Sequence, residues 1–187
     1  MKTQRLVWMS AMLLLATLAG TASAGVFSGV GYTLYWLDAP GGQVKVWGDG
    51  TAPLPPGSNV PPTNHWRYDY ADTNKHPTNA LNTFYAYFNS DNSTDAQFIS
   101  GTAPANWTIL KQGPFAPNNN YKVRYRTTVT GAMIPPGGIL YCTATFTWTG
   151  SRIPGPQNYD AVTSGGSETG VTPVRNTTWG RIKALYR

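Results

Sequence analysis

Two histidines and two aspartates that follow one another closely could bind a metal ion. They are His65, Asp69, Asp72 and His76. Imidazole nitrogens and carboxylate oxygens are the ligands of many zinc sites. The spacing matches no recognised metal-binding pattern, so the sequence favours a polar loop with solvated side chains. We predict no metal and no cofactor at this segment.

A second polar cluster could supply oxygen ligands to calcium. Its members are Asp91, Asn92, Ser93 and Asp95. The segment lacks the glycine and the final glutamate of a helix-loop-helix calcium site. Asn, Asp and Ser are also ordinary turn residues, so a turn explains the cluster.

The chain offers little material for catalysis. Glycoside hydrolysis needs two carboxyl groups in matched environments. The only glutamate, Glu168, falls in a segment expected to be a linker, where nothing would raise its pKa. Neither a Gly-x-Ser-x-Gly elbow nor a glycine-rich phosphate loop is present. We therefore predict no catalytic residue and no enzyme.

Aromatic side chains are the stronger functional signal. The sequence has seven Trp and eleven Tyr. Flat aromatic rings that reach solvent stack on sugars or anchor protein interfaces. Six of them lie opposite apolar partners on expected strands or in polar loops, and they form the predicted ligand-binding set: Trp47, Trp66, Tyr68, Tyr70, Tyr85 and Tyr87. Since strands accept aromatics on both faces, each residue taken alone is also compatible with a structural role.

A basic stripe accompanies the aromatics. Lys122, Arg124 and Arg126 alternate along one expected strand and share its face. The stripe could meet an anionic ligand, be a solvated outer face, or protect a sheet edge from aggregation.

The elements that must position these residues are strands. Residues 139–150 alternate strictly between large apolar and Thr-rich positions, which is typical of a half-buried antiparallel strand. The expected inward set is Leu140, Cys142, Ala144, Phe146 and Trp148, and the outward set is Tyr141, Thr143, Thr145, Thr147 and Thr149. Cys142, the only cysteine, is therefore expected to be a small buried hydrophobe.

Further strands are expected at 30–37, 43–47, 82–88, 96–100, 107–111 and 121–130. The first two should form a hairpin around Gly41 and Gly42, whereas 63–80 shows no clean period and should be part strand, part loop. The strands 121–130 and 139–150 should pair antiparallel. The core should then collect Val123, Tyr125, Val129, Leu140, Phe146 and Trp148.

A Pro-Gly turn leads into the alternating Thr-rich strand between Ile134 and Gly150. This segment resembles the closing strand of bacterial secreted immunoglobulin-like or fibronectin-III-like modules, and the resemblance covers about residues 121–150. It implies an all-β fold, a single antiparallel immunoglobulin-like β-sandwich. It implies no functional residue, because such modules share no common chemistry.

Composition divides the chain into four parts. Residues 1–24 have the form of a cleavable signal peptide, with Lys2, Arg5, a short apolar run and small residues before Gly25. The predicted sandwich spans 25–150. Residues 151–176, rich in Pro, Gly, Ser and Thr, read as a flexible linker. Residues 177–187 form a basic aromatic C-terminal tail, either a detached sorting or anchoring tail or a last element packed on the domain.

These features predict a secreted or cell-surface protein that serves as a non-catalytic structural or adhesive module. The alternatives are a carbohydrate-binding module that uses exposed Trp and Tyr, and a small secreted hydrolase. Expected partners are polysaccharide or other surface proteins, with self-assembly through an open sheet edge or through residues 25–31. The net charge of +6 is too dispersed for nucleic acid. The N-terminal apolar run is short for a bilayer span, so none is expected after cleavage.

Overall fold

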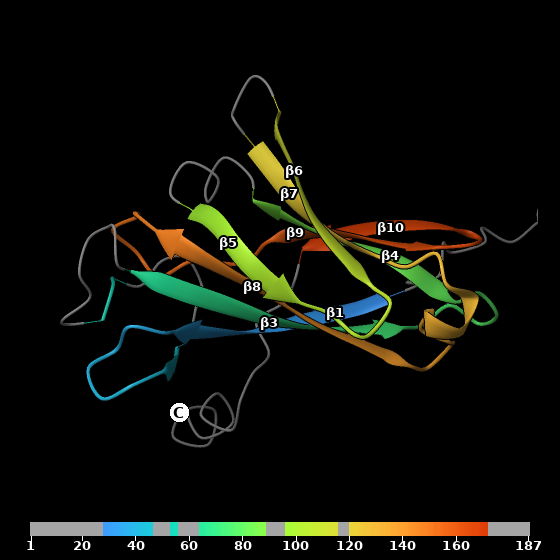
Figure 1. Cartoon of the computed structure of the whole chain (residues 1–187), viewed down its shortest axis with the longest axis horizontal. Coiled ribbons are helices and arrows are strands. Elements are labelled where there is room, and N and C mark those ends of the chain that lie inside the picture. The colour runs from blue at the N-terminus through green and yellow to red at the C-terminus, as the bar shows by residue number, and fades with distance from the viewer. Residues whose placement is uncertain (1–27, 47–52, 56–63, 89–95, 116–119, 172–187) are drawn as a thin grey trace, which may run out of the picture.

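The structure is a computed structural model that describes residues 28–46, 53–55, 64–88, 96–115 and 120–171. Strands dominate this part of the chain, and one 3-10 turn interrupts them (Figure 1). The elements are β1 (Ser28–Trp36), β2 (Val44–Val46), β3 (His65–Asn74), β4 (Leu81–Phe88), β5 (Ala96–Thr102), β6 (Thr108–Phe115), β7 (Asn120–Arg126), η1 (Thr130–Ala132), β8 (Ile139–Trp148), β9 (Asn158–Thr163) and β10 (Gly166–Val171).

The strands form two five-stranded sheets, in the orders β2-β1-β3-β8-β5 and β10-β9-β4-β7-β6. Every pairing is antiparallel. Figure 1 shows β1, β3 and β8 side by side in one layer and β4, β9 and β10 in the other. The predicted all-β sandwich of antiparallel sheets is confirmed. The predicted hairpin is also present, with Gly41 and Gly42 at positive φ between β1 and β2.

The alternation in β8 sorts its side chains between core and surface as expected. Leu140 and Phe146 are fully buried, whereas Tyr141 on the opposite face is 61% exposed. Cys142 is buried on the inward face, and burial raises the pKa of its thiol well above the ordinary value. Its prediction as a small buried hydrophobe is confirmed.

One predicted pairing is wrong. β7 pairs with β4 and β6, whereas β8 pairs with β3 and β5, so the two best-patterned strands lie in different sheets. Alternation identifies the buried face of a strand but not its neighbour. Val129 is also misplaced, at 48% exposed, because β7 ends at Arg126 and the chain turns into η1. The other expected core residues are buried.

The predicted linker is also wrong over most of its length. Residues 158–171 form the β9–β10 hairpin, and β9 pairs with β4, so the sandwich continues past residue 150. Tyr159, Ala161 and Thr163 face inward. β9 shows little apolar contrast in the sequence, because its inward face mixes Tyr159 with a small and a polar residue while Val162 lies on the other face. The predicted signal peptide, residues 172–176 and the C-terminal tail lie outside the described residues.

An aromatic core fills the space between the sheets. The Tyr68 and Phe146 rings stack at 5.1 Å between centroids, and those of Phe88 and Tyr121 stack at 4.7 Å. The buried phenol groups find acceptors across the core, as buried hydroxyls must. Tyr121 and Tyr125, both on β7, donate to carbonyl oxygens of the other sheet.

These phenol bonds tie the layers together. Tyr121 donates to the Ala96 carbonyl at 3.1 Å and Tyr125 donates to the Thr143 carbonyl at 2.7 Å. From the first sheet, Tyr68 donates to the Gly155 carbonyl at 2.6 Å, in the segment that leads into β9. Tyr70 likewise donates to the Gln157 side chain, so each sheet reaches toward the other.

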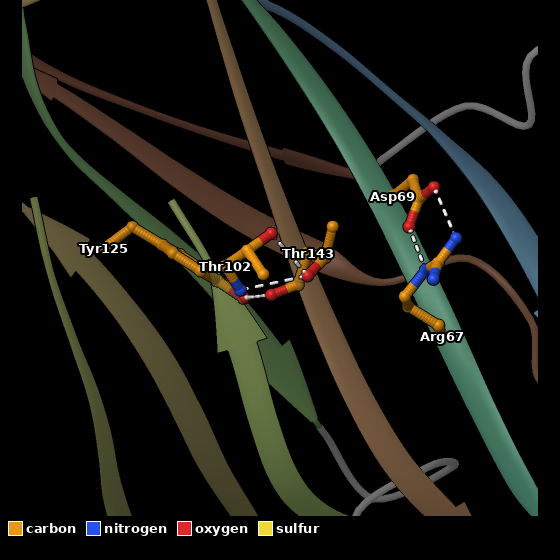
Figure 2. A network of polar contacts seen from close by, with 5 residues as sticks. All are labelled: Arg67, Asp69, Thr102, Tyr125 and Thr143. Carbon is orange, nitrogen blue, oxygen red and sulfur yellow. Dashed lines mark hydrogen bonds and ion pairs between the residues drawn. The ribbon is translucent and has the colours of Figure 1, made fainter. Parts of the chain in front are cut away.

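Figure 2 shows Tyr125 reaching Thr143, whose own hydroxyl meets Thr102 on β5. This junction requires a glycine. A Cβ at Gly101 would lie 2.4 Å from the Thr143 carbonyl oxygen and 3.5 Å from the Tyr125 hydroxyl oxygen. Gly101 therefore allows β5 to approach β8 where the second sheet bonds to it.

Replacing Tyr125 by phenylalanine should lower the free energy of unfolding by about 1–2 kcal/mol, because it removes a buried hydrogen bond and leaves the Thr143 carbonyl without its phenol donor. Urea unfolding measures this change. Tyr141→Phe, at an exposed tyrosine on β8, is the matched control and should change stability by less than about 0.5 kcal/mol. Equal stabilities for the two variants would contradict the role of the inter-sheet bond.

The buried tyrosines should also make the fold sensitive to alkali. Burial raises the pKa of Tyr68, Tyr70 and Tyr125 well above the model-peptide value of 10.0, which their unfolded forms should retain. The unfolded chain therefore loses protons above that pH while the folded chain keeps them. The contribution of these tyrosines to the free energy of unfolding should be fully present below the unfolded pKa. Above that pH the free energy of unfolding should fall by about 1.4 kcal/mol per buried tyrosine for each pH unit. Urea midpoints that do not change between neutral pH and about pH 11 would contradict this.

Candidate functional site

Three of the predicted binding aromatics are core residues. Trp66, Tyr68 and Tyr70 face inward on β3 and are almost completely buried. β3 is the central strand of its sheet, paired on one side with β1 and on the other with β8. The polar residues between them hid this alternation, and their prediction as surface ligands is wrong. Trp47 lies outside the described residues.

The other two predicted aromatics lie on an outer face. Tyr85 and Tyr87 are half-buried on β4, where they alternate with the inward Phe84, Ala86 and Phe88. Their rings are 6.4 Å apart between centroids and inclined at 41°. Two neighbouring tyrosines thus lie on the outer face of the second sheet.

The neighbouring strand adds a cation to these rings. In the register of β4 and β7, Tyr85 is opposite Arg124 and Tyr87 is opposite Lys122, and residues directly opposite share a face. The Lys122 ammonium lies 4.2 Å from the Tyr85 ring centroid, 5.4 Å from that of Tyr87 and 6.0 Å from that of Phe115. Such cation–π contacts hold the ammonium in place. The predicted basic stripe and the two tyrosines therefore form one surface.

The strand on the other side of β4 supplies a carboxylate. Asp160 on β9 is opposite Tyr85, and its carboxylate accepts a hydrogen bond from the Tyr87 phenol. Burial is the largest cause that raises the pKa of Tyr87 above its ordinary value. The hydrogen bond to Asp160 and the negative charge of that carboxylate raise it further. Tyr87 therefore stays a neutral phenol with a fixed hydroxyl direction.

We call this set the aromatic–basic surface; it consists of Tyr85, Tyr87, Leu110, Phe115, Lys122, Arg124, Arg126 and Asp160. Sequence reasoning missed Leu110, Phe115 and Asp160. Leu110 and Phe115 are exposed on β6, and Leu110 lies opposite Arg124. Only the pairing of β6, β7, β4 and β9 brings the members together, and local patterns do not encode that pairing.

The possible metal ligands near β3 do not converge. His65 meets Asp38, with 2.9 Å between Nδ1 and the carboxylate. Asp69 faces outward and pairs with Arg67 at 2.6 Å, as Figure 2 shows, whereas Asp72 is buried on the inner side. Across the described ranges, no group of three His, Cys, Asp or Glu side chains could hold a metal ion.

His76 stabilises a turn through hydrogen bonds to its ring. Its Nδ1 accepts from the backbone N–H groups of Thr78 and Asn79, at 3.1 and 2.8 Å. That nitrogen's lone pair is therefore used within the fold. The predicted polar cluster at 91–95 lies outside the described residues.

The carboxylates do not form a catalytic pair in the described part of the chain. Asp38 and Asp69 each meet a basic partner on the first sheet, Asp72 is in the core, and Asp160 accepts from Tyr87. Glu168 belongs to β10 and not to a linker. Within the described residues no helix has the length and apolarity to cross a bilayer.

Comparisons with known proteins give low similarity. No family model matches the chain, and the search of curated proteins gave no match. A solved CBM of Ruminiclostridium thermocellum is 12% identical over 76% of this chain and 99% of that chain, with a TM-score of 0.37. The seventh ScaB type I cohesin from Pseudobacteroides cellulosolvens is 11% identical over 61% of this chain and 84% of that chain, with a TM-score of 0.33.

Proposed function

We propose that the chain is a non-catalytic adhesive module that acts outside the cell and binds polysaccharide through the aromatic–basic surface. The observation that carries the proposal is the grouping of Tyr85, Tyr87 and Phe115 around Lys122 on an outer sheet face. The extracellular setting rests on the predicted signal peptide at residues 1–24.

The disposition of the acids supports a binding role over hydrolysis. A glycosidase needs two carboxyl groups on either side of one bond. Asp69 faces out from the first sheet, Asp72 faces the core, and Asp160 faces out from the second sheet. These three carboxylates thus point to three different environments.

The chemistry of the surface supports a sugar ligand. Phe115 is 47% exposed and offers an apolar ring to the carbon face of a sugar. Tyr87, Asp160 and Lys122 add a phenol, a carboxylate and an ammonium beside it, which can bond to sugar hydroxyls. The Lys122 ammonium lies nearest to the Tyr85 ring and covers part of it. The rings of Tyr87 and Phe115 are therefore the better stacking candidates.

A structural subunit is the second candidate, and one observation favours it. β2 covers only Leu34–Trp36 of β1, so the same edge from Gly29 to Thr33 has no strand neighbour among the described residues. A strand from another chain could pair there. The predicted donor segment 25–31 does not serve this role over 28–31, because those residues pair with β3 in their own sheet. Concentration-dependent size-exclusion chromatography would reveal such assembly.

Affinity electrophoresis against a panel of soluble polysaccharides tests the proposed function. At least one polymer should retard the protein. Tyr87→Ala and Phe115→Ala should each weaken that binding by roughly tenfold, because they remove the stacking rings. Tyr141→Ala removes an exposed tyrosine from the other sheet and should leave binding unchanged. Failure of every polymer to retard the wild type, or an equal loss in Tyr141→Ala, would refute the proposal.

A further inference from the structure

The outer face of β7 carries a regular row of cations. Lys122, Arg124 and Arg126 occupy alternate positions, so successive Cα atoms are about 7 Å apart along the strand. Their direct neighbours on β6 are Gln112, Leu110 and Thr108. Those on β4 are Tyr87, Tyr85 and Thr83. The row therefore lies between two strands whose facing residues are uncharged.

The row is not neutralised by ion pairs within the described part of the protein. The ion pair formed there joins Arg67 to Asp69 on the first sheet, and His65 makes a hydrogen-bond contact with Asp38 beside it. Asp160 is one strand beyond β4 and accepts from Tyr87. The second sheet thus presents a row of three cations without an ion pair among the described residues, whereas on the first sheet Arg67 is paired with Asp69 and Lys45 stands apart on β2.

Two of these cations are prepared for a ligand. Lys122 is held among three aromatic rings and keeps its ammonium donors. The Nε of Arg124 is buried and has no hydrogen-bond partner among the described residues. A guanidinium donor without an acceptor in a partly buried place is suited to an external anion.

From these observations we infer that the aromatic–basic surface recognises an acidic polysaccharide, one that bears carboxylate or sulfate groups. This inference rests on the proposed function and adds the charge of the ligand. The acidic groups meet Lys122, Arg124 and Arg126, and the sugar rings meet Tyr87 and Phe115. A repeating polyanion matches a repeating row of cations better than a single small anion does.

The test compares polymers that share a backbone and differ in whether it carries anionic groups. Polygalacturonate is paired with its methyl ester, and dextran sulfate is paired with dextran, so the carboxylate and the sulfate are examined separately. Isothermal titration should show binding to at least one polyanion and at least tenfold weaker binding to its neutral counterpart. Binding should weaken further as salt is added.

Matched variants separate the site from general basicity. Lys122→Ala and Arg124→Met should each reduce polyanion affinity by roughly tenfold. Methionine removes the charge of Arg124 and retains an unbranched side chain that can replace the packing of the arginine stem. Lys45→Ala removes the same charge from exposed β2 on the first sheet and should leave the affinity within about twofold. Thermal unfolding of each variant checks that it is folded.

Each outcome decides a different claim. Equal binding of charged and neutral polymers would overturn the inference and leave the proposed function intact. Failure of every polymer would overturn both. An equal loss in Lys45→Ala would overturn the site assignment. Binding to anionic phosphatidylglycerol vesicles, with none to either polyanion, would overturn the assignment of a polysaccharide ligand.

Discussion

Phenol groups inside an aromatic core are the interaction on which this fold depends. Tyr121 and Tyr125 bond from the second sheet to carbonyl oxygens of the first, and Tyr68 and Tyr70 bond from the first sheet to the segment that enters β9. Large rings supply apolar area, and their hydroxyls each require an acceptor. The two sheets must therefore stack in one relative position for all these groups to be satisfied, without help from a disulfide.

That fixed stacking gives the two outer faces different characters. The first sheet presents threonines and the exposed Tyr141 on β8, and its Arg67 is paired with Asp69 and lies 4.9 Å from the Tyr35 ring centroid. The second presents tyrosines, Phe115 and a row of cations without described acidic partners beside it. Because inward aromatic residues already fill the core, the outward aromatics on β4 and β6 are not needed for packing between the sheets. The asymmetry is the physical basis for assigning binding to the second sheet.

Local alternation predicted the class of fold and the buried faces of β4, β7 and β8, because a period of two directly encodes which side is dry. It did not identify β3, where charged residues alternate with Trp66, Tyr68 and Tyr70, and so these core aromatics were assigned to the surface. Nor did it find β9 and β10, in which apolar and polar residues do not alternate regularly. The basic stripe and Tyr85–Tyr87 were both visible in the sequence. Their meeting depends on the pairing of β4 with β7, which is a long-range choice.

The central claim is that the outer face of the second sheet is the ligand-binding face. Amide chemical shifts of the full chain, followed by NMR during titration with an oligosaccharide of a polymer that binds, test it most directly. The account predicts that the largest shifts fall in β4, β6 and β7, around Tyr87, Phe115 and Lys122. Shifts confined to β1, β3 and β8, around Tyr35, Arg67 and Tyr141, would contradict it.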